Sequence, residues 1–505
     1  MLFNSYIFVF LFFPICLIGY YGLIHFRQGV AAKVFLIAMS FWFYGYFNVS
    51  YLLIMVCSIG INYLLHRALS RKPQKALMIL AAAANLGILF YFKYYDFFIS
   101  TINAAFGSSF VLRNILLPLG ISFFTFQQIS FVVDTYRGEV YNCSFVDYTL
   151  FVSFFPQLIA GPIVNHSEML PQFAQIGKKP VLWERISEGL GLFILGLAKK
   201  VLLADTFGVG VDYGYANLGS LGRMDAVIVM VSYSLQMYFD FSGYCDMARG
   251  LGEMLGIELP VNFNSPYKAV NIVDYWKRWH ITLSRFFMKY VYIPLGGSRA
   301  GTARMYLNLM IVFLLSGLWH GAGWNYLVWG AMHGAMYVLT RFWQRSIKPR
   351  TVKEKEKTTL PVSGVAAKIK HIIMTCVSRI LLFVYVSITF VYFRATSIAQ
   401  ANQMLRTAVK GPVQKISADL AACFQVDEFW YVIKVFHLDN MAYSRYILIW
   451  IIIAIGIYLS MIGRNAAERM ERTKYKTGSA LVFAVLTLWC ILTFSQVSTF
   501  LYFNF

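Results

Sequence analysis

Two histidines, His280 and His320, stand beside tryptophan in short aromatic segments, DYWKRWHITLSRF and LLSGLWHGAGWNYLVWG. We expect both imidazoles to be buried. A lone buried histidine commonly makes one structural hydrogen bond, and the residues alone favour that role. The alternative is acid–base chemistry, because a neutral imidazole can accept a proton from a hydroxyl nucleophile near pH 7. Glycines at 317, 321 and 323 favour this chemistry for His320 by leaving room for a substrate, although they would also permit close helix packing.

The other six histidines are better explained by solvent or packing. Four of them border or lie in predicted loops, where imidazoles are usually solvated: His25, His66, His371 and His437. His333 lies within an apolar run beside Gly334, and His166 lies in a turn-rich segment between two prolines. We expect a structural role for these two.

Other catalytic patterns do not occur in the sequence. Two histidines 40 residues apart, without Cys, Asp or Glu at ligand spacing, do not predict a metal site. The seven cysteines form no C-x-x-C pair, so neither a zinc site nor a disulfide framework is indicated. A serine hydrolase is unsupported because no G-x-S-x-G motif is present.

Three basic residues flank the first histidine: Lys277, Arg278 and Arg285. In a bilayer each would cost about 2.5 to 3.5 kcal/mol, so an anion or water must compensate them. Asp246 and Asp274 could supply structural partners. Phosphates of a cytoplasmic acyl donor, such as coenzyme A or a phosphopantetheine-bearing carrier, could do so instead. The sequence leaves both possibilities open.

The composition indicates a membrane protein. Hydrophobic residues make up 59% of the 505 residues and charged residues only 13%, whereas soluble domains carry roughly 25% charge. The 44 Lys and Arg exceed the 23 Asp and Glu, which in a soluble protein would suggest nucleic acid. Here the basic residues lie between apolar runs, where cytoplasmic loops and anionic headgroups attract them. We therefore expect a membrane as partner and no nucleic acid.

Apolar runs long enough to cross a bilayer recur along the chain, roughly eleven to thirteen in number. They predict an all-α, polytopic helical bundle that forms one membrane domain over residues 1–505. The runs cover 2–24, 34–47, 51–65, 76–92, 115–133, 148–164 and 190–204, then 226–241, 305–319, 326–342, 372–393, 446–462 and 480–500. Charged residues, Gly and Pro interrupt this pattern over 243–323. Such a segment is tolerated at membrane depth only if protein buries it or it lines a cavity.

Loops rich in Lys and Arg orient the chain. They lie at 67–75, 345–370 and 464–476, and we expect all three to be cytoplasmic. Counting spans from them places both termini and the long connection 395–444 outside. The number of runs between the first two basic loops is odd, so one run is re-entrant or one was missed. Within the outer connection, QANQMLRTAVKG is amphipathic and is expected to lie along the surface.

The motifs around the histidines resemble the membrane-bound O-acyltransferase family, in particular its bacterial alginate O-acetylase branch. The resemblance rests on YFDFSGYCDMARGLGEMLGIELPVNFNSPYKAVNIVDYWKRWHITLSRFFMKYVYIPLGGSR and LSGLWHGAGWNYLVWGAMHG. It extends along the chain through FKYYDFF, LPLGISFFTFQQISFVVDTYRG, SFFPQLIAGPIVNHSEMLPQF and TFLYFNF. Two positions depart from the pattern: Asn165, where an arginine is expected, and Arg249, where a small or aliphatic residue is usual.

The resemblance implies a helical bundle around a central tunnel in a bacterial plasma membrane, with roughly eleven to thirteen transmembrane or re-entrant helices. It implies that His320 is the catalytic residue, accompanied by His280. An acyl donor would enter from the cytoplasm, and the acceptor hydroxyl would come from outside. We expect substrate contacts from the polar and aromatic residues around these histidines, namely Trp276, Lys277, Arg278, Trp279, Arg285 and Asn325.

The first functional hypothesis is therefore an O-acyltransferase, specifically an O-acetyltransferase for an extracellular or cell-envelope polysaccharide. It would act directly or through a separate extracytoplasmic transferase of the SGNH type. We expect no tightly bound cofactor, because the donor, acetyl-CoA or an acyl carrier thioester, is a co-substrate. One alternative is D-alanyl transfer to teichoic acid with an acyl carrier protein. A transporter of polymers or small molecules is the alternative from another class, since polar residues at membrane depth would suit it.

The basic loops predict a topology that cysteine labelling can test. Single cysteines near residues 355 and 470 should be cytoplasmic, and one near residue 420 should be outside. In intact cells an impermeant thiol reagent should therefore label only the third. Labelling near 355 without labelling near 420 would contradict the predicted orientation.

Overall fold

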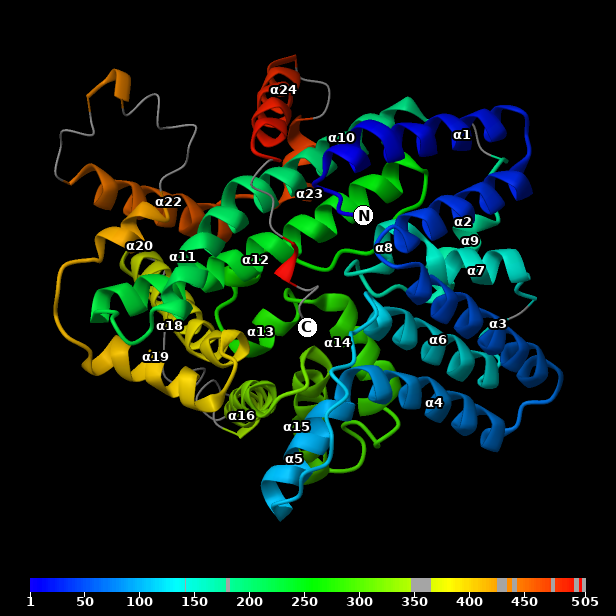
Figure 1. The fold of residues 1–505 in the computed structure, drawn as a ribbon, viewed down its shortest axis with the longest axis horizontal. Helices are drawn as coiled ribbons and strands as arrows, with labels where there is room; N and C mark the ends of the chain where they lie inside the picture. The colour runs from blue at the N-terminus through cyan, green and yellow to red at the C-terminus, as the bar shows by residue number, and fades with distance from the viewer. Residues whose placement is uncertain are drawn as a thin grey trace. The chain divides into compact units, whose positions relative to one another are not determined.

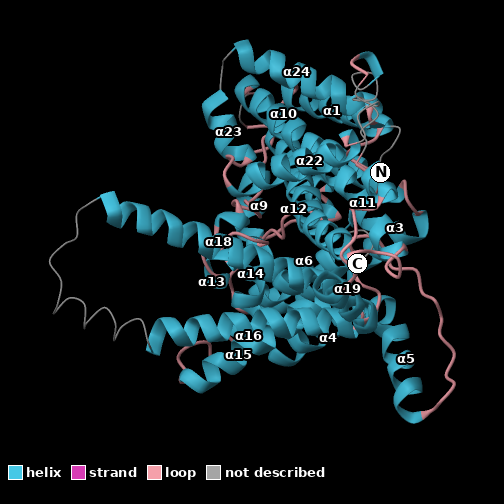
Figure 2. Ribbon diagram, turned by 90° about the vertical axis from the view of Figure 1, so that its left-hand side faces the viewer, coloured by secondary structure: helices cyan, strands magenta, loops and turns pink. Residues whose placement is uncertain are grey.

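The computed structural model describes residues 1–140, 142–178, 182–346, 365–424, 434–437, 443–473, 477–494 and 499–501. Within these residues the chain is helical and contains no strand, which confirms the predicted all-α class (Figure 2). The chain forms two compact units. The first unit comprises Met1–Val201, Phe241–Val261 and Ala466–Phe505, and the second comprises Leu202–Asp240 and Asn262–Asn465.

The first unit consists mainly of the N-terminal helices (Figure 1). Its elements are η1 (Phe8–Phe12), α1 (Phe13–His25), α2 (Gly29–Gly45), α3 (Val49–Arg71), α4 (Lys75–Leu89), η2 (Phe90–Tyr94), α5 (Tyr95–Phe106), α6 (Ile121–Tyr136), α7 (Phe145–Ser153), α8 (Phe155–Leu158), α9 (His166–Phe173), α10 (Trp183–Ala198), α23 (Ala466–Thr473) and α24 (Thr477–Leu492). The short η3 (Lys199–Ala204) follows α10, and the unit also takes residues 241–254 of α12 (Arg223–Met254).

Helix α6 is the buried centre of this unit, with α3 and α4 packed against it. Polar side chains join the three helices. Ser58 donates to Gln128 Oε1 over 2.8 Å, and Asn62 and Asn85 exchange amide hydrogen bonds of 3.1 and 2.7 Å. Asn62 also donates to Gln128. Because lipid offers no hydrogen-bond partners, these mutual bonds fix the three helices to one another.

A buried lysine anchors the described C-terminal residues within the same unit. Lys200 is 1% exposed, and its ammonium donates to the carbonyl of Thr499 over 3.2 Å. The ammonium also lies 4.7 Å from the ring centroid of Phe500, whose ring packs edge-on against Tyr244. A buried ammonium needs such partners, so Lys200 fixes the place of the TFLYFNF motif at residues 499–501.

The second unit carries both tryptophan-flanked histidines. Its elements are α11 (Asp205–Ala216), residues 223–240 of α12, η4 (Pro266–Lys268), α13 (Ile272–Trp276), α14 (Ile281–Phe287), η5 (Met288–Tyr292), α15 (Thr302–His320), α16 (Trp324–Ser346), α18 (Val365–Arg394), α19 (Ile398–Lys410), α20 (Ala418–Ala422) and α22 (Ser444–Met461). Helices α15 and α16 lie side by side, and α18 packs against α16 (Figures 1 and 2). The short helices α13 and α14 come between the long ones because this segment is rich in polar residues.

Five helices among the described residues are long and apolar enough to cross a bilayer: Phe8–His25, Val49–Arg71, Lys75–Phe106, Thr302–His320 and Lys368–Arg394. The predicted run 148–164 is wrong as a single span, because α7 ends at Ser153 and only the four-residue α8 follows before an irregular stretch. The run predicted from 115 becomes helical only at Ile121, since Gly120 has a φ of +71°. The sequence also missed α5, which continues α4 through the π-turn η2.

Helices lie in the described parts of both long connections. In the basic loop 345–370, α16 ends at Ser346 and α18 begins at Val365, and residues 347–364 lie outside the described part. The connection 395–444 contains α19 and α20, while 425–433 and 438–442 are outside the described residues. The amphipathic segment is a helix, α19, which buries Ala401 and Met404.

Glycines let the backbones of α15 and α16 touch. A Cβ on Gly317 would meet the carbonyl oxygen of Tyr326 in α16. A Cβ on Gly330 would lie 2.5 Å from the carbonyl oxygen of Phe313 in α15. Backbone atoms cannot move aside as a flexible side chain can, so any larger residue would force the two helices apart.

Replacing Gly330 with Ala should therefore destabilise the protein by about 1–3 kcal/mol through overpacking. Thermal unfolding of the purified protein in detergent would measure this loss. Gly87→Ala is the matched control, because a Cβ at Gly87 in α4 meets nothing within 4 Å. A Gly330→Ala protein as stable as the control would show that the contact does not constrain the helices.

Candidate active site

His280 lies in a sharply bent connection between α13 and α14. Its φ is +45°, a left-handed conformation that is uncommon for residues other than glycine. The side chain is fully buried, and its Nδ1 lies 3.1 Å from Oδ1 of Asn262. Burial lowers the pKa of His280, since desolvation disfavours the imidazolium. The ring is therefore neutral at physiological pH and has a nitrogen lone pair for accepting a proton or hydrogen bond.

His320 is the last residue of α15, where Gly321 takes an extended conformation and the helix ends. The imidazole is 3% exposed and packs among aromatic rings. Its ring centroid lies 4.9 Å from Trp319, 5.2 Å from Trp329 and 5.2 Å from Phe393. The end of α15 thus presents the histidine inside an aromatic enclosure, as its tryptophan-rich context predicted.

The structure brings the two histidines together. Their ring centroids are 6.1 Å apart, within the usual range of direct aromatic contact, and Trp319 lies 5.9 Å from His280. The two imidazoles are enclosed by tryptophan. At such a site an imidazole can take a proton from a hydroxyl group away from bulk water. This juxtaposition supports the acid–base interpretation over two separate structural histidines.

The expected space around the glycines is filled. A Cβ on Gly321 would collide with the ring of Tyr326, and one on Gly323 would collide with Oδ1 of Asn325. These glycines therefore serve close packing between α15 and α16, the alternative that the sequence had left open. Substrate access to His320 must come from another side of the ring.

Trp276 and Trp279 are buried, with 7% and 3% of their surfaces exposed. The indole N–H of Trp276 faces His333 Nδ1 at 3.3 Å, and His333 Nε2 faces Thr389 Oγ1 at 3.0 Å. Thr389 in turn donates to the carbonyl of Val386. Because an indole can only donate, His333 accepts at Nδ1 and donates from Nε2. This relay gives His333 the structural role expected of it, and it fixes Trp276 beside Trp329.

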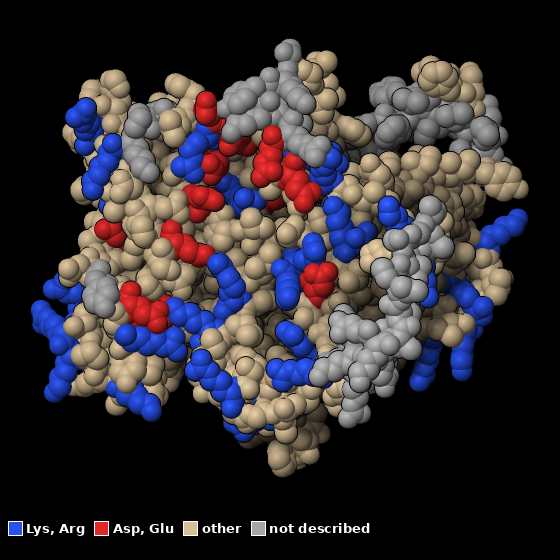
Figure 3. Space-filling model, turned by 180° about the vertical axis from the view of Figure 1, so that it is seen from behind, with Lys and Arg blue, Asp and Glu red and all other residues tan. Residues whose placement is uncertain are grey.

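The basic residues around His280 differ in their surroundings. Lys277 and Arg285 are exposed, whereas Arg278 is half-buried and pairs with Asp274 over 2.9 Å. The proposed pairing of these cations with Asp246 is wrong, because Asp246 pairs with Lys199 of the first unit over 2.5 Å. Basic side chains predominate on the face drawn in Figure 3, with acidic ones among them. Lys277 and Arg285 thus lie at the surface near the segment that carries His280.

Asn325, predicted to contact substrate, holds two helices together. Its Nδ2 donates to the carbonyls of Tyr392 and Ala395 over 3.1 and 2.8 Å. These carbonyls stand at the C-terminal end of α18, so Asn325 ties the start of α16 to it. The contact keeps Phe393, which lies between Tyr392 and Ala395 in the chain, against His320.

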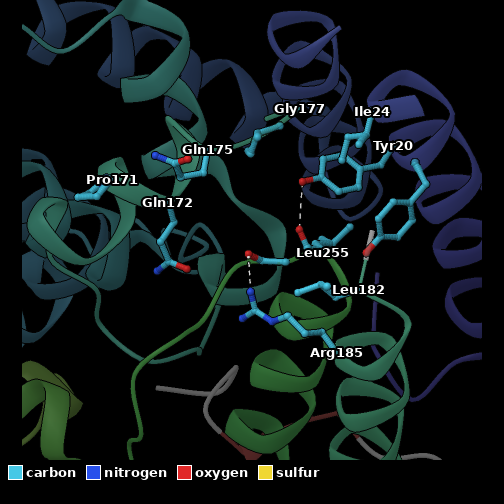
Figure 4. A pocket seen from close by; sticks show the side chains of 12 residues that line it. Tyr20, Ile24, Pro171, Gln172, Gln175, Gly177, Leu182, Arg185 and Leu255 are labelled. Carbon is cyan, nitrogen blue, oxygen red and sulfur yellow. Dashed lines mark hydrogen bonds between the residues drawn. The ribbon is translucent and has the colours of Figure 1, made fainter. Parts of the chain in front are cut away.

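A cavity of about 500 Å³ lies within the first unit and contains none of the predicted site residues (Figure 4). Two of its polar side chains bond to residues at or just after the end of α12. Tyr20 donates to the carbonyl of Leu255 over 3.0 Å, and Arg185 donates to the carbonyl of Gly256 and to Glu253. These bonds join α1 and α10 to the end of α12.

One cluster of potential metal ligands occurs among the described residues, formed by Asp134, Glu139 and His166. His166 Nε2 lies 3.1 Å from Asp134, and Arg137 approaches the same carboxylate at 3.7 Å. A guanidinium beside the carboxylate already supplies positive charge, so an ion-pair network accounts for the cluster. The unusual Asn165 caps α9 here, with Glu168 completing a capping box.

Sequence reasoning missed Asn262 as a partner of His280. The two residues are 18 positions apart, on either side of η4 and α13, and no periodic pattern connects them. The only local signal was the polar, turn-forming character of NFNSPY.

The chain matches the family model of the membrane-bound O-acyltransferases over residues 36–386, which includes His280 and His320. It belongs to this family. It is accordingly a multi-pass membrane protein and an acyltransferase acting on hydroxyl groups, which confirms the family, the fold class and the enzymatic hypothesis and sets aside the transporter.

Individual relatives point to O-acetylation. The chain is 40% identical to the peptidoglycan O-acetyltransferase of Helicobacter pylori over 439 residues, covering 81% of this chain and 80% of that protein. It is 39% identical to the probable alginate O-acetylase of Pseudomonas putida over 351 residues, 68% and 71% of the two chains. The teichoic acid D-alanyltransferase of Streptococcus thermophilus is a more distant relative, 26% identical over 48% of this chain and 61% of that protein.

The relay through His333 predicts a stability effect. His333→Leu leaves the buried Trp276 indole N–H without its acceptor, while the Thr389 hydroxyl keeps its bond to Val386. A buried polar group left unsatisfied costs about 1–3 kcal/mol. Thermal unfolding in detergent should show a clear loss. The control is Tyr385→Phe, which deletes one hydrogen bond from Tyr385 to Met332 between the same helices, α16 and α18. Equal stability of the two variants would mean that the relay contributes little.

Proposed function

We propose that this chain transfers an acetyl group from a cytoplasmic thioester donor to a hydroxyl on the other side of the membrane, for O-acetylation of a cell-envelope polysaccharide. Peptidoglycan is the favoured final acceptor, because similarity to the peptidoglycan enzyme covers four fifths of both chains and that to the alginate acetylase covers less. The structural observation that carries the proposal is the buried His280–His320 pair inside the matched segment.

In this mechanism His320 is the general base. Its neutral imidazole accepts the proton of the acceptor hydroxyl while the oxygen attacks the thioester carbonyl carbon. The new C–O bond forms, the tetrahedral intermediate collapses, and the C–S bond breaks. The departing thiolate takes the proton back from the imidazolium, so the histidine returns to its neutral form. A positioned base of this kind contributes about 10² to 10⁴ in rate.

In this mechanism the aromatic rings around His320 keep water away from the base. Trp319, Trp329 and Phe393 surround His320 and limit the access of water to it. Water is itself a hydroxyl nucleophile and would hydrolyse the thioester if the base activated it. Exclusion of water therefore favours transfer to the acceptor over loss of the acyl group.

Lys277 and Arg285 are the proposed binding residues for the acyl donor. Both side chains are exposed near the segment that carries His280, and phosphate groups of acetyl-CoA or of an acyl carrier thioester would pair with them. Arg278 contributes less to such binding, since Asp274 already holds its guanidinium. The donor enters and leaves as a co-substrate.

The proposal places the chain in a bacterial plasma membrane with both termini outside. The final acceptor is reached directly or through a separate extracytoplasmic transferase of the SGNH type, with the connection 395–444 on the same side. D-alanyl transfer to teichoic acid, assisted by an acyl carrier protein, is the second candidate. The lower identity and shorter coverage of that relative make it the weaker one.

His320→Gln should reduce polysaccharide acetylation by about 10² to 10⁴, because glutamine cannot act as a base at neutral pH. Glutamine is preferable to alanine here, since His320 packs against three aromatic rings and alanine would leave a cavity. The measurement is ester-linked acetate per envelope polysaccharide, divided by the amount of the protein in the membrane.

His371→Gln, at an exposed position in α18, is the matched control and should keep full activity. A well-expressed His320→Gln variant with acetylation near that of the control would contradict the assignment of the base.

A further inference from the structure

Three donors converge on one oxygen of Asn262. His280 Nδ1 lies 3.1 Å from Oδ1, the backbone N–H of Thr282 donates to it over 3.2 Å, and the Thr282 hydroxyl does so over 2.9 Å. A backbone N–H can only donate, so the amide atom that faces Thr282 must be the oxygen and not the nitrogen. The orientation of the Asn262 amide is thereby fixed by its surroundings.

The orientation of this amide decides the tautomer of His280. An amide oxygen only accepts, so the Nδ1 that faces it carries the proton. In the neutral ring the other nitrogen, Nε2, then has the lone pair and can accept but not donate.

The backbone holds this arrangement rigidly. The amide of Ile281 donates to the carbonyl of Asn262 over 3.0 Å, and the amide of Asn264 donates to the carbonyl of Arg278 over 2.9 Å. These bonds clamp residues 262–264 against 278–281 and maintain the left-handed conformation of His280, which costs about 1–3 kcal/mol on its own. Strain that the surroundings enforce is typical of sites where one side chain must be held in one position.

The groups that face His280 come from two elements. Phe263, next to Asn262, stacks on the ring at 6.4 Å, and α15 contributes Trp319 at 5.9 Å and His320 at 6.1 Å. The titratable member of this set is His320. The ring of His280 with its accepting nitrogen therefore belongs to the same enclosure as the proposed base.

We infer that Asn262 is a positioning residue that holds His280 as the Nδ1–H tautomer, so that His280 acts in acyl transfer as a hydrogen-bond acceptor. This inference rests on the proposed function and deepens it. His280 Nε2 accepts from His320 or from the acceptor hydroxyl and keeps that group aligned. It cannot, in its neutral form, donate to the oxyanion that develops on the thioester carbonyl.

Asn262→Asp tests this role while preserving an oxygen at the same place. A carboxylate favours the imidazolium and so raises the pKa of His280, and a protonated Nε2 can no longer accept. Acetyl transfer should therefore fall as the pH is lowered through the raised pKa. The ratio of variant to parent rate, measured in membranes with acetyl-CoA and soluble muropeptides, should drop about tenfold or more between pH 8 and pH 5.

Thr282→Val is the matched control. It removes one of the three hydrogen bonds to the same oxygen but adds no charge, so its ratio to the parent should stay constant over this pH range. A constant ratio for Asn262→Asp as well would overturn the inference.

The tautomer itself can be measured without any reaction. In the full-length protein labelled with ¹⁵N-histidine in detergent, the shifts of the His280 ring, assigned with His280→Asn, should report a protonated Nδ1 and an unprotonated Nε2. An Nε2–H tautomer would overturn the inference even if His320 proves essential. Conversely, an Nδ1–H tautomer with no acetyl transfer by the parent protein would count against the proposed function alone.

Discussion

The contact between the backbones of α15 and α16 is the constraint on which the candidate site depends. Gly317 and Gly330 allow each helix to approach the carbonyl groups of the other, and this approach sets the relative position of the two helices. His320 at the end of α15 is thereby placed against Trp329 of α16. Asn325 then ties the start of α16 to the end of α18, which brings Phe393 against the same imidazole.

The apolar surroundings of such a site require that its polar groups be paired within the protein. Arg278 pairs with Asp274, Trp276 bonds to His333, and the amide oxygen of Asn262 receives three donors. Each pairing also immobilises a side chain. The same bonds that make burial tolerable therefore orient the rings around His280 and His320, which is the preorganisation that acyl transfer needs.

The sequence predicted the features that depend on neighbouring residues in the chain. Apolar runs coincide with the five helices of the described residues that are long enough to cross a bilayer. The tryptophan contexts of His280 and His320 predicted two buried imidazoles. The interruption of helix after α7 and the start of α6 at Ile121 were not predicted, because they depend on Gly and Pro positions within runs that remain apolar. The partners of Asp246 and His280 were missed for another reason. Lys199 is 47 residues from Asp246, and Asn262 is separated from His280 by two short helices, so tertiary packing alone brings each pair together.

The central claim is that the chain carries an acetyl group from a cytoplasmic thioester to a hydroxyl acceptor across the membrane. The most direct measurement uses inside-out membrane vesicles, whose cytoplasmic face is outward, supplied externally with acetyl-labelled acetyl-CoA. The account predicts base-labile labelled ester in material enclosed by the vesicles, in an amount that depends on this chain. Equal labelling in vesicles with and without the chain would contradict it.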